Sequence, residues 1–118
     1  MSAELPPQIK NQLAQLQQIQ QQAQAIAVQK NQVEITLKET ELALSELDKL
    51  DADAVVYKAI GDLLIKTERD KTKEDLKEKK DTLDLRLQTL ARQEERIQTR
   101  FQQLQEQLKQ AIGAPSAQ

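Results

Sequence analysis

The sequence contains no histidine and no cysteine. This excludes zinc sites of the Cys/His kind, thiol nucleophiles, disulfides and acid–base schemes that use imidazole. A glycine-rich phosphate-binding loop is also missing, so nothing in the sequence supports ATP binding. Neighbouring carboxylates such as Glu94 and Glu95 point in different directions on a helix and do not make a general-acid pair. We therefore expect no enzymatic activity, no cofactor and no metal site.

Residues that fill compact cores or break helices are scarce. Aromatic residues make up only 2% of the chain, fewer than a compact core normally uses. Two glycines and three prolines among 118 residues are too few for a chain made of many turns. These five residues are Pro6, Pro7, Gly61, Gly113 and Pro115. Because all of them lie near an end or in the middle of the sequence, two long uninterrupted helices fit between them.

The charge balance argues against nucleic acid as a partner, and the lack of long apolar runs argues against a membrane span. Seventeen basic residues stand against 19 acidic ones, so no positive excess is available to hold phosphates. No apolar run follows a basic start, and no stretch approaches the roughly 20 apolar residues that a membrane span needs. We expect one soluble, cytoplasmic, mainly helical domain over residues 1–118.

Two heptad stripes predict two long helices of coiled-coil type. In residues 8–50, nine of the twelve core positions are apolar. They are Ile9, Gln12, Leu16, Ile19, Ala23, Ile26, Lys30, Val33, Leu37, Thr40, Leu44 and Leu47. In residues 72–112, nine of eleven are apolar. They are Leu76, Lys80, Leu83, Leu87, Leu90, Glu94, Ile97, Phe101, Leu104, Leu108 and Ala111.

Local signals set the expected ends of these helices. Pro7 suits a first helical turn, and Thr72 followed by Asp75 resembles a capping pair for the second helix. Gly113 and Pro115 should stop that helix. The prediction is a helix over about 7–50, a second over about 72–112, and a short flexible tail at 113–118.

The middle segment, about residues 54–68, predicts a β-hairpin. It is rich in strand-forming residues, and Gly61-Asp62 divides it into two short runs. Its large apolar side chains fall on both faces. They are Val55, Val56, Tyr57, Ile60, Leu63, Leu64 and Ile65. A lone two-stranded hairpin is marginal in water, so we expect these residues to mediate oligomerisation into a closed sheet or barrel.

One antiparallel register accounts for most of both stripes. Its layers join residues whose position numbers add up to 120, such as Leu16 with Leu104 and Leu37 with Leu83. The 25 residues from 48 to 72 that remain are what one hairpin and its turns require. The fold class is therefore mainly α: a long antiparallel helical coiled-coil hairpin with a central β-hairpin that joins an oligomeric β-barrel platform.

Lys30, Thr40, Lys80 and Glu94 are polar residues at seam positions. In the register above, Lys30 and Glu94 fall in adjacent layers and can pair, and Thr40 faces Lys80. Such groups can fix the register of a coiled coil. The alternative is that the lysine stems simply lie along the seam while their ammonium groups reach water.

The sequence resembles the beta-type subunit of prefoldin. The resemblance rests on the hairpin motif VYKAIGDLLIK between two helices of equal length. The runs LAQLQQIQQQAQAIAVQK and LARQEERIQ are similar to the archaeal version. The resemblance implies a hexamer of two alpha-type and four beta-type subunits, whose hairpins build a β-barrel platform. It also implies coiled coils whose tips hold non-native polypeptides without ATP and pass them to a group II chaperonin.

The ends of the coil far from the hairpin are the expected site for non-native polypeptides, because charge is sparse there and apolar residues are frequent. The candidate residues are Leu5, Ile9, Leu13, Leu16, Phe101, Leu104, Leu108 and Ile112. Leu13 and Ile112 lie outside the seam positions, so helix pairing does not account for them. The alternative function is a structural or tethering coiled-coil oligomer, in which all eight serve the seam and no unfolded protein is bound.

Overall fold

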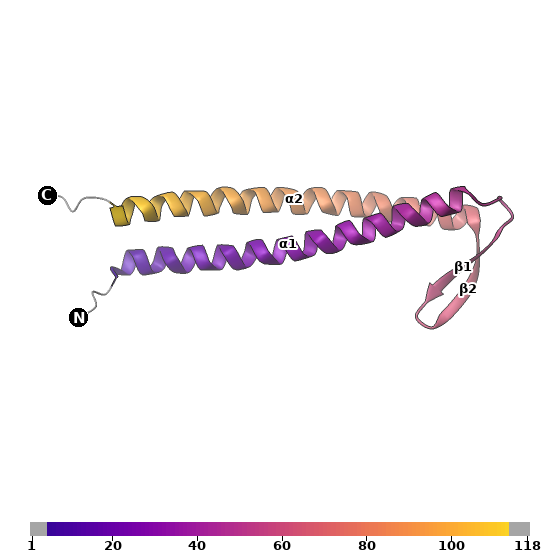
Figure 1. Cartoon of the computed structure of the whole chain (residues 1–118), viewed down its shortest axis with the longest axis horizontal. Helices are drawn as coiled ribbons and strands as arrows, with labels where there is room; N and C mark the ends of the chain where they lie inside the picture. Colours follow the sequence, from indigo (N-terminus) through magenta and orange to yellow (C-terminus); the bar gives the residue numbers. More distant parts are fainter. Residues whose placement is uncertain (1–4, 114–118) are drawn as a thin grey trace. The chain divides into compact units, whose positions relative to one another are not determined.

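The computed structural model describes residues 5–113, which form two long helices joined by a two-stranded sheet (Figure 1). Helix α1 spans Pro7–Asp48 and helix α2 spans Arg69–Gly113. Strands β1 (Val55–Ile60) and β2 (Leu63–Glu68) lie between them. The predicted mainly helical class with a central β-hairpin is confirmed. The chain divides into two compact units, residues 1–30 with 89–118 and residues 31–88.

The start of α1 follows the proline signal. The Pro6 carbonyl accepts hydrogen bonds from the amides of Ile9 and Lys10, both at 3.0 Å. Pro7 therefore takes the first helical position, where a missing N–H leaves no bond unmade. Helix α1 ends at Asp48, two residues before the predicted limit of about 50.

The predicted start of the second helix is wrong. Helix α2 begins at Arg69, directly after the last residue of β2, so no linker separates strand and helix. Thr72 does not cap the helix: its Oγ1 lies inside the helix and donates to the Glu68 carbonyl at 2.8 Å. The same oxygen lies 3.1 Å from Thr67 Oγ1. Helix α2 extends to Gly113, one residue past the predicted limit of about 112, and Pro115 with the rest of the expected tail lies outside the described residues.

The hairpin has the predicted two-residue turn. Strands β1 and β2 are antiparallel, with Val55 opposite Glu68 at the base and Ile60 opposite Leu63 at the turn. Gly61 has a φ of 59°, and no other residue of the described chain has a positive φ. A positive φ at the first central position alone is typical of a type II′ turn, whose twist matches that of the strands.

The first unit pairs α1 with α2 in the predicted register. Lys30 Nζ lies 2.9 Å from Glu94 Oε1, and the two side chains are 30% and 42% exposed. This confirms the predicted pairing of these two seam residues. One hollow of the unit is lined by members of two predicted layers, Ile19 with Phe101 and Ala23 with Ile97. Four seam residues of the unit are buried, namely Ile9, Ile19, Leu90 and Leu104.

The second unit agrees with the same register. Lys73 Nζ lies 2.6 Å from Asp48 Oδ1, two residues whose position numbers add up to 121. The buried seam residues here are Val33, Leu37, Thr40 and Leu47. Thr40 is only 3% exposed, and its hydroxyl donates to the Thr36 carbonyl at 2.8 Å. The Thr40 hydroxyl is thus satisfied within α1 and needs no help from Lys80 across the seam.

The register predicts which cysteine pairs can form a disulfide. Leu16→Cys with Leu104→Cys should crosslink within one chain under mild oxidation, because the two positions share a layer and a disulfide needs Cα atoms within about 7 Å. Leu16→Cys with Leu90→Cys should not, because these positions lie two heptads apart, roughly 20 Å along the axis. Non-reducing electrophoresis under dilute conditions distinguishes the two, and the reverse result would contradict the register.

Candidate functional site

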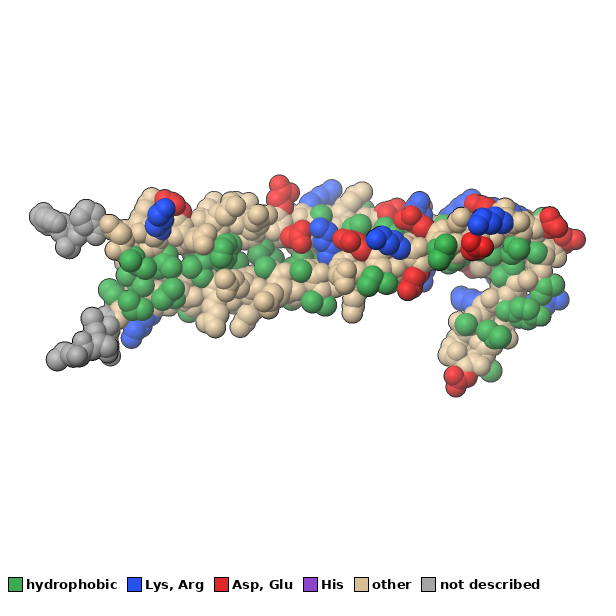
Figure 2. Space-filling view, viewed as in Figure 1, with side chains coloured by type: hydrophobic (Ala, Val, Ile, Leu, Met, Phe, Trp, Pro, Cys, Tyr) green, Lys and Arg blue, Asp and Glu red, His purple; other side chains and the backbone are tan. Residues whose placement is uncertain are grey.

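The hairpin exposes most of its apolar side chains. Of the seven residues predicted to mediate oligomerisation, Val56 is half-buried and the others are exposed, with Leu64 at 71% and Leu63 at 66%. The remaining exposed ones are Val55, Tyr57, Ile60 and Ile65. Figure 2 shows green hydrophobic side chains over this hairpin. An apolar group of this extent on so small an element marks an interaction surface.

The strand pairing distributes these residues over two faces. One face carries Val55, Tyr57 and Leu64. The other carries Val56 and Ile60, together with Leu63, Ile65 and Thr67. Only the base of the second face is partly covered, since Val56 and Thr67 are the strand residues that are not exposed. They line a hollow of about 380 Å³ together with Leu47, Leu50 and Leu76. The chain's own helices therefore leave one face and the outer half of the other open.

Polar contacts hold the base of the hairpin. Arg69 Nε donates to the Leu47 carbonyl at 2.9 Å, and the Arg69 side chain is only 15% exposed. Carbonyls in the last turn of a helix have no partner within it, so the first residue of α2 caps the end of α1. The ion pair of Lys73 with Asp48 joins the same two helix ends. The end of α1 and the start of α2, between which the hairpin is inserted, are thereby held together.

The residues predicted to be functional do not include this cluster. The ion pair had a usable signal, because Asp48 and Lys73 fit the predicted register within one residue. The role of Arg69 had no signal in the sequence. This role requires that β2 enters α2 without a linker and that the Leu47 carbonyl lies within reach of the Arg69 side chain.

The ion pair at the base predicts a dependence of stability on pH. The hydrogen bond from Lys73 is the main cause that holds the pKa of Asp48 below its ordinary value of 3.8. A lowered pKa in the folded state stabilises the fold above the unfolded pKa, and this contribution is lost as the pH falls through the lowered value.

Asp48→Asn should therefore unfold at lower urea concentration than the parent at pH 7, and the difference should shrink as the pH falls through the lowered pKa of Asp48. Asp51→Asn is the matched control, because Asp51 is an exposed neighbour that takes part in no ion pair within residues 5–113. A difference for Asp48→Asn that stays constant with pH would contradict the role given to this carboxylate.

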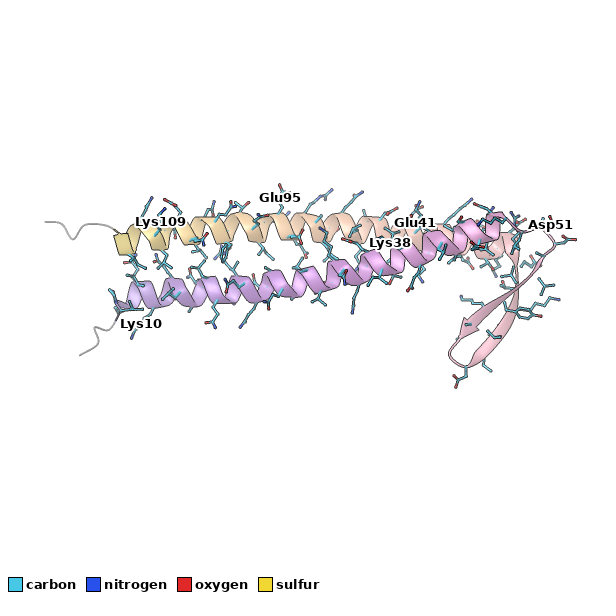
Figure 3. The ribbon with its side chains drawn as sticks, viewed as in Figure 1. Lys10, Lys38, Glu41, Asp51, Glu95 and Lys109 are labelled. Atoms are coloured by element: carbon cyan, nitrogen blue, oxygen red, sulfur yellow. The ribbon has the colours of Figure 1, made fainter. Side chains whose placement is uncertain are left out.

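The predicted tip residues divide into three groups in the first unit. Ile9 and Leu104 are buried. Leu16, Phe101 and Leu108 are half-buried in the seam. The exposed group consists of Leu5 at 45%, Leu13 at 40% and Ile112 at 61%. Figure 2 shows hydrophobic side chains gathered near the free ends of both helices, and Figure 3 labels two of the few charges there, Lys10 and Lys109. Five of the eight residues thus serve the seam, and three remain available.

The seam is weakened near these ends. Gln12 occupies a seam position in the layer of Leu108, and its Oε1 is buried without a hydrogen-bond partner among the described residues. A buried polar group left unpaired costs about 1–3 kcal/mol. On the α2 side, Leu108 and Ile112 line an open hollow with glutamine neighbours. The helix pairing is therefore less favourable in this layer than in the apolar layers.

Residues 5–113 lack two further kinds of site. No three acidic side chains lie close enough together to hold a metal ion. Neither helix is long and apolar enough to cross a membrane.

Comparison with known proteins identifies the family to which the chain belongs. The profile of the family described as "Prefoldin subunit" matches residues 10–114. A prefoldin subunit beta from Methanococcoides burtonii is 65% identical over 113 residues, which cover 96% of this chain and 97% of that protein. One from Methanosarcina acetivorans is 58% identical over the full length of both chains. The crystal structure of the prefoldin beta subunit from Thermococcus strain KS-1 superposes with a TM-score of 0.86 at 41% identity, covering 97% of this chain and all of that one.

Two long helices with a two-stranded hairpin between them therefore define a subunit of the chaperone class and not of a known enzyme family. The chain belongs to the prefoldin family, and the relatives that it matches over nearly its whole length are beta subunits of archaea.

Proposed function

We propose that the chain is one subunit of a cytoplasmic, ATP-independent holdase, with no enzymatic activity of its own. It assembles through its hairpin into a hexamer of two alpha-type and four beta-type subunits. The assembly captures non-native polypeptides at the free ends of its coiled coils and passes them to a group II chaperonin. The observation that carries the proposal is the presence of exposed apolar residues both on the hairpin and at the free helix ends.

Assembly follows from the physics of the hairpin. Within the described residues the sheet has only two strands, so each strand has one edge with unpaired N–H and C=O groups. Open edges beside exposed Tyr57, Leu63 and Leu64 favour pairing with further strands. Hairpins from neighbouring subunits would satisfy the edges and cover the apolar faces together, and a closed barrel leaves no edge.

Capture follows from the free ends. Leu5, Leu13 and Ile112 are exposed, and glutamine is the most frequent residue around them. A single contact of this kind is weak and unselective, which suits cargo without a fixed structure. Several ends acting on one polypeptide raise the overall affinity through effective concentration, without any single strong site.

The transfer of cargo to a chaperonin rests on the family resemblance. The tethering alternative is favoured by one observation: five of the eight candidate tip residues are already used by the seam. In that alternative the assembly forms in the same way, and the free ends hold nothing.

The assembly role predicts that charge on the hairpin prevents oligomerisation. Tyr57→Asp with Leu64→Asp places two carboxylates on one exposed apolar face, where burial in a barrel would leave them unpaired at high cost. Sedimentation with an alpha-type partner should show loss of the complex, with helical circular dichroism largely retained. The control variant, Leu13→Asp with Ile112→Asp, also replaces two exposed apolar residues by aspartate and should assemble normally. Full assembly of the hairpin variant would contradict the barrel.

The capture role predicts that polar free ends protect cargo poorly. Leu5→Ser, Leu13→Ser and Ile112→Ser together should reduce suppression of aggregation of a denatured model protein several-fold, because the loss is repeated at every copy in the complex. High salt should leave capture by the parent intact, since apolar contacts are not screened.

The matched control is Ile35→Ser with Leu42→Ser, which removes exposed apolar side chains of α1 from the second unit. It should protect cargo like the parent. If the triple variant assembles and also protects like the parent, the free ends do not bind cargo and the tethering alternative gains support.

A further inference from the structure

The outer side of α1 carries a second apolar pattern that neither the seam nor the hairpin explains. Leu42 is 62% exposed and Ile35 is 49% exposed, one heptad apart in the second unit. Val28, at the same heptad position in the first unit, is 60% exposed.

These residues lie opposite the seam. Ile35 is two residues from both Val33 and Leu37, which are buried. At about 100° per residue, it points about 200° away from each of them. Leu42 is placed in the same way between the buried Thr40 and the half-buried Leu44. Helix α2 therefore cannot cover either side chain in the paired register.

The pattern is confined to one line of the helix. The two other outward heptad positions of α1, over residues 10–46, hold only Gln, Asn, Lys, Glu, Ser or Ala. Single exposed apolar residues are ordinary on a protein surface. In the second unit, isoleucine and leucine at one position of two successive heptads, with no large apolar residue at the neighbouring outward positions, indicate a surface with a partner.

The charged residues around this line are mostly acidic. Residues 34–46 contain four glutamates and one lysine. Glu39 and Glu46 lie along one side of the line, and Glu34 and Glu41 along the other. Lys38 is the single base among them, and Figure 3 labels it with Glu41 on α1. It lies three residues after Ile35 and four before Leu42, beside the line on the side of Glu34 and Glu41. Glu46 pairs with Lys49 at 3.2 Å, whereas Glu39 and Glu41 take part in none of the ion pairs within residues 5–113.

We propose that the face of α1 carrying Ile35 and Leu42 docks a lysine- or arginine-rich amphipathic helix of a partner protein. Apolar residues seven apart, about 10 Å along the axis, match the two-turn spacing of an approaching helix. The carboxylates on both sides complement basic residues that flank the apolar stripe of such a helix. A second copy of this face is disfavoured, because it brings like charges together. This surface is additional to the assembly and capture roles and does not depend on them.

Two peptides of about three heptads test the proposal against the full chain. Both carry leucine along one helical face; one has lysine at the flanking positions and the other has glutamate. Fluorescence anisotropy of each labelled peptide gives its Kd at low and at high salt. The lysine peptide should bind and the glutamate peptide should not.

Ile35→Ser with Leu42→Ser should weaken binding of the lysine peptide about tenfold or more. Glu39→Gln with Glu41→Gln should weaken it less and flatten its salt dependence. Leu13→Ser with Ile112→Ser, the control for capture at the free ends, should change the Kd by less than about twofold. All these side chains are exposed, and circular dichroism checks that each variant keeps its helices.

Several results would overturn the proposal. The first is that the lysine peptide does not bind at any accessible concentration. The second is that both peptides bind equally well. The third is that the parent and the Ile35→Ser, Leu42→Ser variant bind the lysine peptide equally well. Loss of binding in Leu13→Ser with Ile112→Ser would mean that the peptide is held as cargo. A change in oligomeric state on Ile35→Ser with Leu42→Ser alone would assign the face to a second copy of the chain.

Discussion

The pairing of α1 and α2 through a narrow stripe, two positions in seven, is the constraint on which the other features depend. A stripe of this width makes no compact core. Most seam residues in the described chain are only half-buried, and none is less than 2% exposed. Stability is therefore spread over many layers of modest area, and each layer contributes locally. One consequence is that a polar layer weakens the structure where it occurs. Another consequence is that apolar residues outside the stripe cannot be buried within the chain and stay exposed.

The base of the hairpin shows how such a thin structure keeps an appended element in position. A strand that enters a helix without a linker transmits the direction of the helix to the hairpin, and Arg69 ties this junction to the end of α1. A hydrogen bond from a guanidinium to a helix carbonyl does two things at once. It gives the Leu47 carbonyl, which also accepts from the Leu50 amide, a second donor, and it joins the two helix ends. In the proposed assembly the hairpin presents two apolar faces to other strands and needs a fixed base, because the half-buried Val56 and Thr67 give it little packing of its own.

Much of this arrangement could be predicted because its signals are periodic or strictly local. The heptads give both helices and the register in which Lys30 meets Glu94, and Gly61-Asp62 gives the turn. The same local rule failed at Thr72, since a capping signal decides a helix start only if the residues before it are not already helical. At the free ends, periodicity identifies Leu13 and Ile112 as outside the stripe, and both are exposed. It cannot give the unpaired Gln12 oxygen, which depends on how closely the two helices approach.

Three kinds of exposed apolar surface result, and their neighbours determine what each can select. Beside the hairpin residues lie backbone edges, which accept strands of matching register and little else. Around Leu5, Leu13 and Ile112 lie glutamines, which form hydrogen bonds of either polarity and impose no charge pattern, so this surface is unselective. Around Ile35 and Leu42 lie carboxylates, which repel acidic partners and favour basic ones. The apolar side chains supply similar attraction in all three places. For the proposed partners, selectivity therefore follows from the polar groups that surround these side chains.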